Sequence, residues 1–248
     1  MEIKKYDSSL KEEWNKLIRE SRNGTFILER NFMEYHSDRF TDHSLLFYDD
    51  SKLIAVLPAN IKDNILYSHQ GLTYGGIIQA ERTSISQIQQ IVDLLIRYLK
   101  DEKIEKLIYK PVPHIYHRSP AEEDLYVLFH AGATLYRRSV ASTINLGQKT
   151  EFDKSRKRAL KRAINYNYIV EEENTFAAFW KVLETNLGGR HGVRPVHSLE
   201  EIEYLHSNFP ENIRIFSAFS PDHELAGSAL IFETETVAHL QYCSTTPD

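Results

Sequence analysis

The sequence predicts an α/β protein with mixed sheets, built from two units in tandem. Apolar residues make up 42% and charged residues 26% of its 248 residues, which is the balance of an ordinary globular protein. In the first half, apolar strands precede a long amphipathic helix. A run of three apolar strands returns in the second half with hardly any matching residues, so we interpret it as a diverged structural repeat.

The first unit is expected over residues 1–148. Residues 44–61 read as two strands around a tight polar turn, and residues 64–70 as a third strand that runs into a glycine-rich loop. Residues 83–103 form the clearest helix, because their isoleucines and leucines recur at a period near 3.6. The elements expected after it are a strand, a short helix and a pair of strands, over 104–112, 120–132 and 133–146.

The second unit is expected over residues 149–248. A basic helix opens it near 151–167, two further helices follow, and three strands end near residue 246. A serine with an acidic residue three positions later predicts a capping box at three helix starts: Ser9 with Glu12, Ser119 with Glu122, and Ser198 with Glu201. Compared with the first half, the second unit is incomplete at its C-terminus.

Composition limits the class of protein. No apolar run is long enough to cross a membrane and the N-terminus carries no signal-peptide pattern, so we expect a cytoplasmic protein with no membrane partner. The single cysteine, Cys243, excludes an internal disulfide framework and a zinc–cysteine site. The net charge of −5 argues against nucleic-acid binding by the protein as a whole.

The element order, with a loop between a third strand and a long helix, resembles the GNAT acyltransferase fold. Two such units with a basic helix opening the second resemble the Fem-type aminoacyl and peptidyl transferases and their FemAB-like acetyltransferase relatives. Phrases such as "SHQGLTYGG", "YKPVPHIYH", "PVHSLEEI" and "AHLQY" are similar to a bacterial FemAB-like group. In that family a complete second unit would continue past Asp248 with its own loop, helix and closing strands.

The resemblance implies transfer of an acyl or aminoacyl group to an amine of a small molecule or peptide. The donor would be acyl-CoA or aminoacyl-tRNA, which makes tRNA a possible partner. A non-catalytic module that binds a ligand or a protein through the same fold is the alternative. The chemistry needs a deprotonated amine and hydrogen-bond donors for the developing oxyanion, and it needs no metal.

The glycine-rich loop, Gly71 to Gly76, has two interpretations. It is either a strand-end turn that uses glycine for a positive φ, or part of a ligand site. In the second case His69 and Gln70 would contact substrate, and the Tyr74 hydroxyl would take part in catalysis.

A second cluster follows the strand near residue 108. Two prolines stiffen the chain there, and its polar side chains suit a substrate-contacting wall. The candidates are Lys110, His114, Tyr116, His117 and Glu123. The alternative is that the acidic residues only cap the next helix. Two histidines without a third ligand do not predict a metal site.

The second unit supplies the remaining candidates. Arg156, Lys157 and Arg158 would bind phosphate, unless the basic helix merely presents a solvated face; its Ala159, Leu160, Ala163 and Ile164 predict a packed face.

His239 and Tyr242 lie on opposite faces of the last strand, and either is a candidate general acid or base; a buried, hydrogen-bonded histidine is the alternative. Arg190 and Arg194, in the loop 188–198, suit an anionic substrate, or the loop is a mobile connection.

Overall fold

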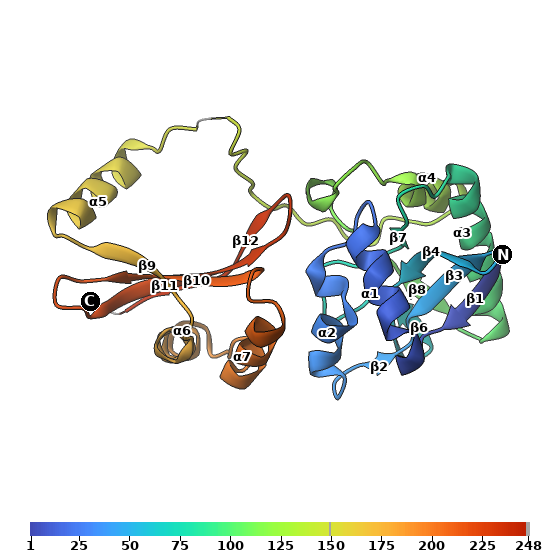
Figure 1. The fold of residues 1–248 in the computed structure, drawn as a ribbon, viewed down its shortest axis with the longest axis horizontal. Coiled ribbons are helices and arrows are strands. Elements are labelled where there is room, and N and C mark those ends of the chain that lie inside the picture. Colours follow the sequence, from blue (N-terminus) through green and yellow to red (C-terminus); the bar gives the residue numbers. More distant parts are fainter. Residues whose placement is uncertain (149, 247–248) are drawn as a thin grey trace. The chain divides into compact units, whose positions relative to one another are not determined.

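A computed structural model describes residues 1–148 and 150–246 (Figure 1). The chain divides into two compact units. One comprises Met1–Ala133 with Glu233–Ala238, and the other comprises Thr134–Phe232 with His239–Asp248. Within the described residues, every helix is too short or too polar to cross a membrane.

Two four-stranded sheets form the first unit. The first has the order β1 (Glu2–Lys5), β3 (Leu45–Asp49), β4 (Lys52–Leu57) and β7 (Ile78–Gln79), and neighbouring strands are antiparallel. The second has the order β2 (Thr41–Asp42), β5 (Asn60–Lys62), β6 (Ile65–Tyr67) and β8 (Lys106–Ile108), in which only β6 and β8 are parallel.

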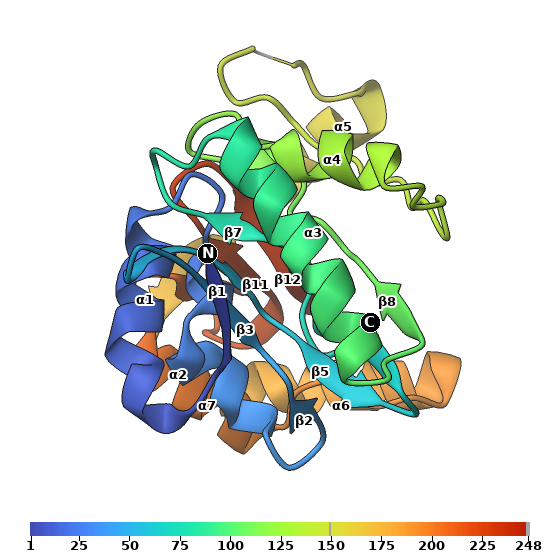
Figure 2. The same ribbon diagram turned by 90° about the vertical axis from the view of Figure 1, so that its right-hand side faces the viewer.

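Helix α3 (Ile85–Asp101) covers these strands and lies in front of them in Figure 2. Four residues of its predicted apolar stripe, Ile88, Ile91, Val92 and Leu95, are buried in one core with residues of both sheets. At the two ends of the predicted stripe, Leu99 is partly buried and Ile85 is exposed. The other helices of the unit are α1 (Lys11–Glu20), α2 (Arg30–Met33) and α4 (Glu123–His130), together with short 3₁₀ turns.

The predicted caps have mixed outcomes. Ser198 and Glu201 form the expected capping box. Ser9 and Glu12 do not, because Asp7 caps a 3₁₀ turn there and α1 begins only at Lys11. At the third site α4 begins at Glu123, too late for a box from Ser119.

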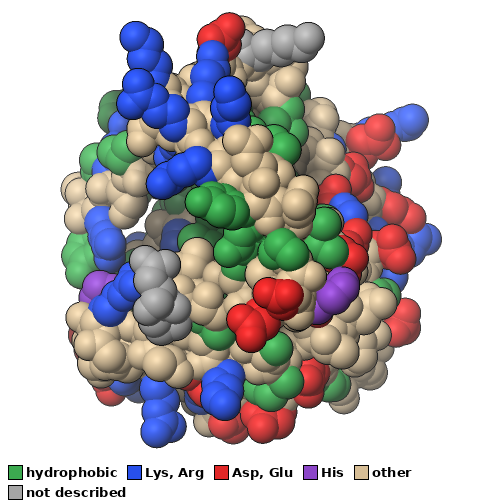
Figure 3. Space-filling model, turned by 90° about the vertical axis from the view of Figure 1, so that its left-hand side faces the viewer, with side chains coloured by type: hydrophobic (Ala, Val, Ile, Leu, Met, Phe, Trp, Pro, Cys, Tyr) green, Lys and Arg blue, Asp and Glu red, His purple; other side chains and the backbone are tan. Residues whose placement is uncertain are grey.

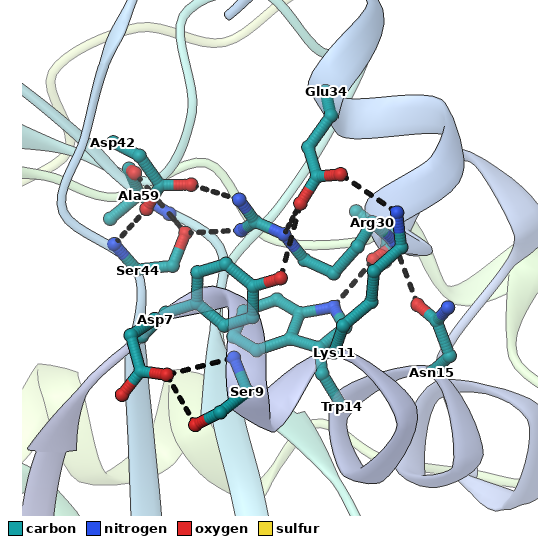
Figure 4. A network of polar contacts seen from close by, with 12 residues as sticks. Asp7, Ser9, Lys11, Trp14, Asn15, Arg30, Glu34, Asp42, Ser44 and Ala59 are labelled. Atoms are coloured by element: carbon teal, nitrogen blue, oxygen red, sulfur yellow. Dashed lines mark hydrogen bonds and ion pairs between the residues drawn. The ribbon is translucent and has the colours of Figure 1, made fainter.

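A buried polar network ties α1 and α2 to the strands of the first unit (Figure 4). The Arg30 guanidinium is almost fully buried and lies 3.6 Å from the centre of the Tyr6 ring. It donates to Glu34 at 3.2 Å, to Ser44 Oγ at 3.2 Å and to Asp42. Since Asp42 and Ser44 belong to the segment that leads from β2 into β3, the network fixes α2 against these strands.

The second unit has one sheet, in the order β12 (Ala238–Thr245), β11 (Leu225–Glu233), β10 (Ile213–Phe219) and β9 (Ile169–Glu173). Helices α6 (Ala177–His191) and α7 (Leu199–Asn208) lie on the same side of this sheet (Figure 1). Buried side chains of these two helices form a core with buried side chains of β10 and β11. The residues of this core include Phe179, Trp180, Leu183, Ile202, Leu205, Ile213, Ile215 and Leu230.

The two units repeat one plan. In each, helices separate the first strand from three further strands, and the sheet orders β1-β3-β4-β7 and β9-β10-β11-β12 correspond one to one. The tandem repeat is therefore confirmed. The counterpart of β12 is β7 rather than the strand at 65–67, because that strand pairs in the other sheet. The glycine-rich loop consequently precedes β7 and does not lead directly into α3.

The expected strand pair over 133–146 is wrong. No residue of this segment is in a strand, and Leu135, Tyr136 and Val140 are strongly exposed. Strands need a hydrogen-bonded neighbour, and alternating apolar residues cannot supply one by themselves.

Candidate functional site

Packing accounts for the glycines of the 71–76 loop. A Cβ atom at Gly71 would lie 2.2 Å from His36 Nε2, and one at Gly75 would lie 2.1 Å from the Ser68 carbonyl oxygen. Gly76 has φ +79°, a conformation that favours glycine, and it lies against the Tyr109 hydroxyl. These contacts support the interpretation of the loop as a strand-end turn.

His69 and Gln70, at the start of this loop, are both engaged in packing. His69 is 4% exposed, and its ring lies edge-on to that of His36 with centroids 5.2 Å apart. Burial, with a smaller contribution from His36, lowers the pKa of His69 to about 3, so its imidazole is neutral at pH 7. The Gln70 amide group and backbone N–H form two hydrogen bonds of 2.8 Å with Asn60.

Tyr74 is also buried. Its hydroxyl forms a 2.9 Å hydrogen bond with Thr25 Oγ1, and its ring packs at a tilt against that of Tyr116, with centroids 4.6 Å apart. Burial raises the pKa of Tyr74, which keeps the phenol protonated. In this arrangement Tyr74 and Tyr116 join the loop to the turn at His114–Tyr116.

The structure brings the 110–123 candidates next to the glycine-rich loop, and most of them have protein partners. Gly75 N–H donates to the Lys110 carbonyl at 2.9 Å, and the Lys110 ammonium donates to the Leu72 carbonyl. Burial lowers the pKa of Lys110. His117 Nε2 lies 3.0 Å from the Val112 carbonyl oxygen.

Glu123 completes a polar tie in the same unit. Its carboxylate accepts from Arg22 at 2.9 Å and from the Gln79 amide at 3.0 Å. Partial burial raises the pKa of Glu123, but hydrogen bonds, including that from Arg22, outweigh this effect and lower the pKa below its ordinary value. Of the candidates in this cluster only His114 is exposed.

The second unit contains a pair of side chains suited to proton transfer. Tyr242 Oη on β12 lies 2.8 Å from His197 Nδ1 in the loop before α7. His197 is 6% exposed, and burial raises the pKa of Tyr242. The phenol is therefore protonated at neutral pH and is hydrogen-bonded to a buried imidazole.

The indole of Trp180, in α6, packs against Tyr242 of this pair. Its ring meets that of Tyr242 edge to face, with centroids 5.5 Å apart. The indole is 1% exposed, yet Nε1 has no acceptor among the described residues. Leaving a buried donor unpaired costs about 1–3 kcal/mol, so this N–H suits a polar group brought in by a ligand.

The fold places the pair at the border of its sheet. β12 is an edge strand of the second unit, and its register alternates side chains between the two faces. Tyr242 contacts α6, whereas His239 belongs to the opposite face, as the sequence predicts. Burial lowers the pKa of His239. Arg190 and Arg194 are exposed, at the end of α6 and in the following loop.

His197 lies in the loop 188–198, for which the sequence predicts an anionic substrate, and Trp180 was not a candidate residue. The two residues that contact Tyr242 lie far from it in the sequence, and only the folded unit brings them together. Trp180 belongs to the apolar stripe of α6, where a tryptophan normally indicates core packing.

Helix α5 (Lys154–Asn165) carries Arg156, Lys157 and Arg158, all exposed. Lys157 pairs with Glu151 at 2.5 Å and Arg156 with Asp153 at 3.9 Å. Figure 3 shows Lys and Arg side chains gathered at the top of the molecule, over α5.

The packed face expected for α5 is wrong. Ala159, Leu160 and Ile164 are exposed, and Ala163 is only partly buried.

Among the described residues no group of three His, Cys, Asp or Glu side chains is arranged to hold a metal ion.

No protein-family model and no curated protein matches the sequence. Solved structures do match its fold. FemX matches with a TM-score of 0.63 over 100% of this chain and 81% of its own, at 10% identity. L-PGS from Bacillus licheniformis matches with a TM-score of 0.61 over 98% of this chain and 67% of its own, at 14% identity. The chain thus has the Fem-type fold of tandem GNAT-like units.

Proposed function

We propose that the chain is an acyltransferase that moves an acyl or aminoacyl group to the amine of a small molecule or peptide. Two findings support this proposal: the Fem-type fold, and the hydrogen bond between Tyr242 on the edge strand β12 and His197 in the loop before α7. The pair is the observation that carries it, because a protonated phenol linked to an imidazole provides the proton transfers that acyl transfer needs.

The residues have distinct tasks in this reaction. The amine nitrogen attacks the donor carbonyl, and a C–N bond forms as the C–S or C–O bond of the donor breaks. Tyr242 gives its proton to the departing sulfur or oxygen. The proton that the amine loses returns to the Tyr242 phenolate through His197, so the enzyme ends unchanged. The Trp180 ring packs against Tyr242, and its unpaired N–H would donate to an oxygen of the bound donor.

The donor is acyl-CoA or aminoacyl-tRNA, with Arg156, Lys157 and Arg158 as candidate phosphate ligands and Arg190 and Arg194 as candidates for an anionic acceptor. Both donors belong to the cytoplasm, where we place the chain. Tyr74, His69 and Gln70 serve as packing residues of the first unit in this proposal.

Calorimetric titration tests the proposal. The full chain is titrated with acetyl-CoA, with CoA and with aminoacyl-tRNA, and any donor that binds is then incubated with a set of amines and peptides. We expect one donor class to bind and its acyl group to appear on an amine nitrogen. If no donor binds, the proposal is wrong. If a donor binds but no amine is acylated, the non-catalytic alternative replaces it.

A further inference from the structure

Helix α5 has two exposed faces of opposite character. Six of its twelve residues are Lys or Arg and none is acidic, although the whole chain has a net charge of −5. Most of these cations recur at helical spacing and share one face: Lys154, Lys157, Arg158, Lys161 and Arg162. The cations are therefore concentrated locally.

The other face of α5 is mainly apolar. Leu160 lies one helical turn before Ala163 and Ile164, and one turn after Arg156, the one cation on this face. Leu160 and Ile164 are 51% and 61% exposed. Exposed aromatic residues flank both ends of the helix, with Phe152 before it and Tyr166 after it. Burying the exposed parts of these two aliphatic side chains would stabilise a complex, because their apolar surface leaves water.

We propose that α5 binds parallel to the surface of an anionic lipid membrane, with Leu160 and Ile164 inserted at the acyl boundary. Basic helices with an apolar face and flanking aromatic residues bind such surfaces, because the cations meet lipid phosphates while the apolar side chains leave water. A nucleic acid would neutralise the cations but leave the apolar face in water. This proposal departs from the expectation of no membrane partner, which was based on the absence of a membrane-spanning segment.

Sedimentation of the full chain with vesicles tests this inference. Vesicles of phosphatidylcholine alone are compared with vesicles that also contain phosphatidylglycerol. We expect binding only to the second kind, with an affinity that falls as salt is added. The double variant Leu160→Gln/Ile164→Gln should lose at least about 10-fold in affinity, because it removes the apolar face while glutamine keeps the helix and its charge.

Two controls separate apolar insertion from charge and from general damage. Phe129→Gln, at an exposed apolar residue of α4, should bind vesicles like the unchanged protein. Arg158→Gln/Arg162→Gln should lose about 5-fold in affinity for each cation removed. Circular dichroism confirms that each variant is folded.

Three outcomes would overturn the inference. They are the absence of binding to phosphatidylglycerol vesicles, equal binding to both kinds of vesicle, and equal affinity of Leu160→Gln/Ile164→Gln and the unchanged protein. The same variants are titrated with bulk tRNA. Tight tRNA binding that is insensitive to Leu160→Gln/Ile164→Gln, without vesicle binding, would make α5 a nucleic-acid site instead.

Discussion

The buried imidazole of His69 should make the stability of the first unit depend on pH. An unfolded histidine titrates near its ordinary value of 6.5, whereas the pKa of folded His69 is about 3. Between these values the unfolded chain binds more protons than the folded one. Stability is therefore full above pH 7 and falls as the pH drops through 6.5 towards 3.

The size of this effect follows from the pKa difference. From pH 7 to pH 5, His69 should lower the free energy of unfolding by about 2 kcal/mol, and the loss should reach about 5 kcal/mol below pH 3. Asp42 is the acidic group near His69, while His36, Arg30 and Lys110 oppose its protonation. Because other histidines also titrate, the contribution of His69 appears as a difference between variants.

The substitution His69→Asn isolates this contribution. Asn does not titrate, and it tolerates the left-handed backbone at this position, where φ is +66°. Urea unfolding is followed by tryptophan fluorescence in a Trp180→Phe background, so that Trp14 reports on the first unit alone. Between pH 7 and pH 5, the free energy of unfolding should fall by about 2 kcal/mol less in His69→Asn than in the protein that keeps His69.

The matched control is His130→Asn, at an exposed histidine of α4, which should leave the pH dependence unaltered. If His69→Asn also leaves it unaltered, His69 is not a buried neutral imidazole. The description of the glycine-rich loop as a packed turn would then be wrong, and its interpretation as a ligand site would return.

Two further predictions concern the scaffold of the first unit and a helix of the second. Arg30→Met should lower the free energy of unfolding, measured in urea, by about 3–5 kcal/mol, because Glu34 and Asp42 lose a buried partner. The control Arg39→Met, at an exposed arginine, should change it by less than about 0.5 kcal/mol. Equal losses of stability in the two variants would contradict the role of the Arg30 network. Gly71→Ala should destabilise the protein through its clash with His36, whereas Gly189→Ala, in α6 with open space around it, should stabilise it by about 0.5–1 kcal/mol. A shift of the thermal unfolding midpoint in the same direction for both glycine variants would refute this distinction.

Local patterns in the sequence predicted much of the fold. The stripe of α3 and the capping box at Ser198 depend on neighbours within a few turns, and both are present. The strand pair over 133–146 failed because a strand requires a partner that its own residues cannot reveal. The apolar face of α5 failed for a related reason, since helical spacing shows a face but not what covers it.

The candidate site was less accessible to sequence reasoning. Tyr242 was a candidate because of its strand, but its hydrogen bond to His197 joins residues 45 positions apart. In the other unit, His69, Tyr74 and Glu123 looked like site residues because polar groups near glycine often bind ligands. Their partners in the folded unit are His36, Thr25 and Arg22, respectively, and all three come from a distant part of the sequence.

The proposed role of Tyr242 is tested most directly by Tyr242→Phe, which removes one hydroxyl from the site. Turnover with the identified donor and amine is compared for this variant and for Tyr204→Phe, at an exposed tyrosine of α7, with calorimetry of donor binding alongside. We predict that kcat falls about 100-fold or more for Tyr242→Phe while donor affinity is kept, and that Tyr204→Phe behaves like wild type. An unchanged kcat for Tyr242→Phe would contradict the proposed mechanism.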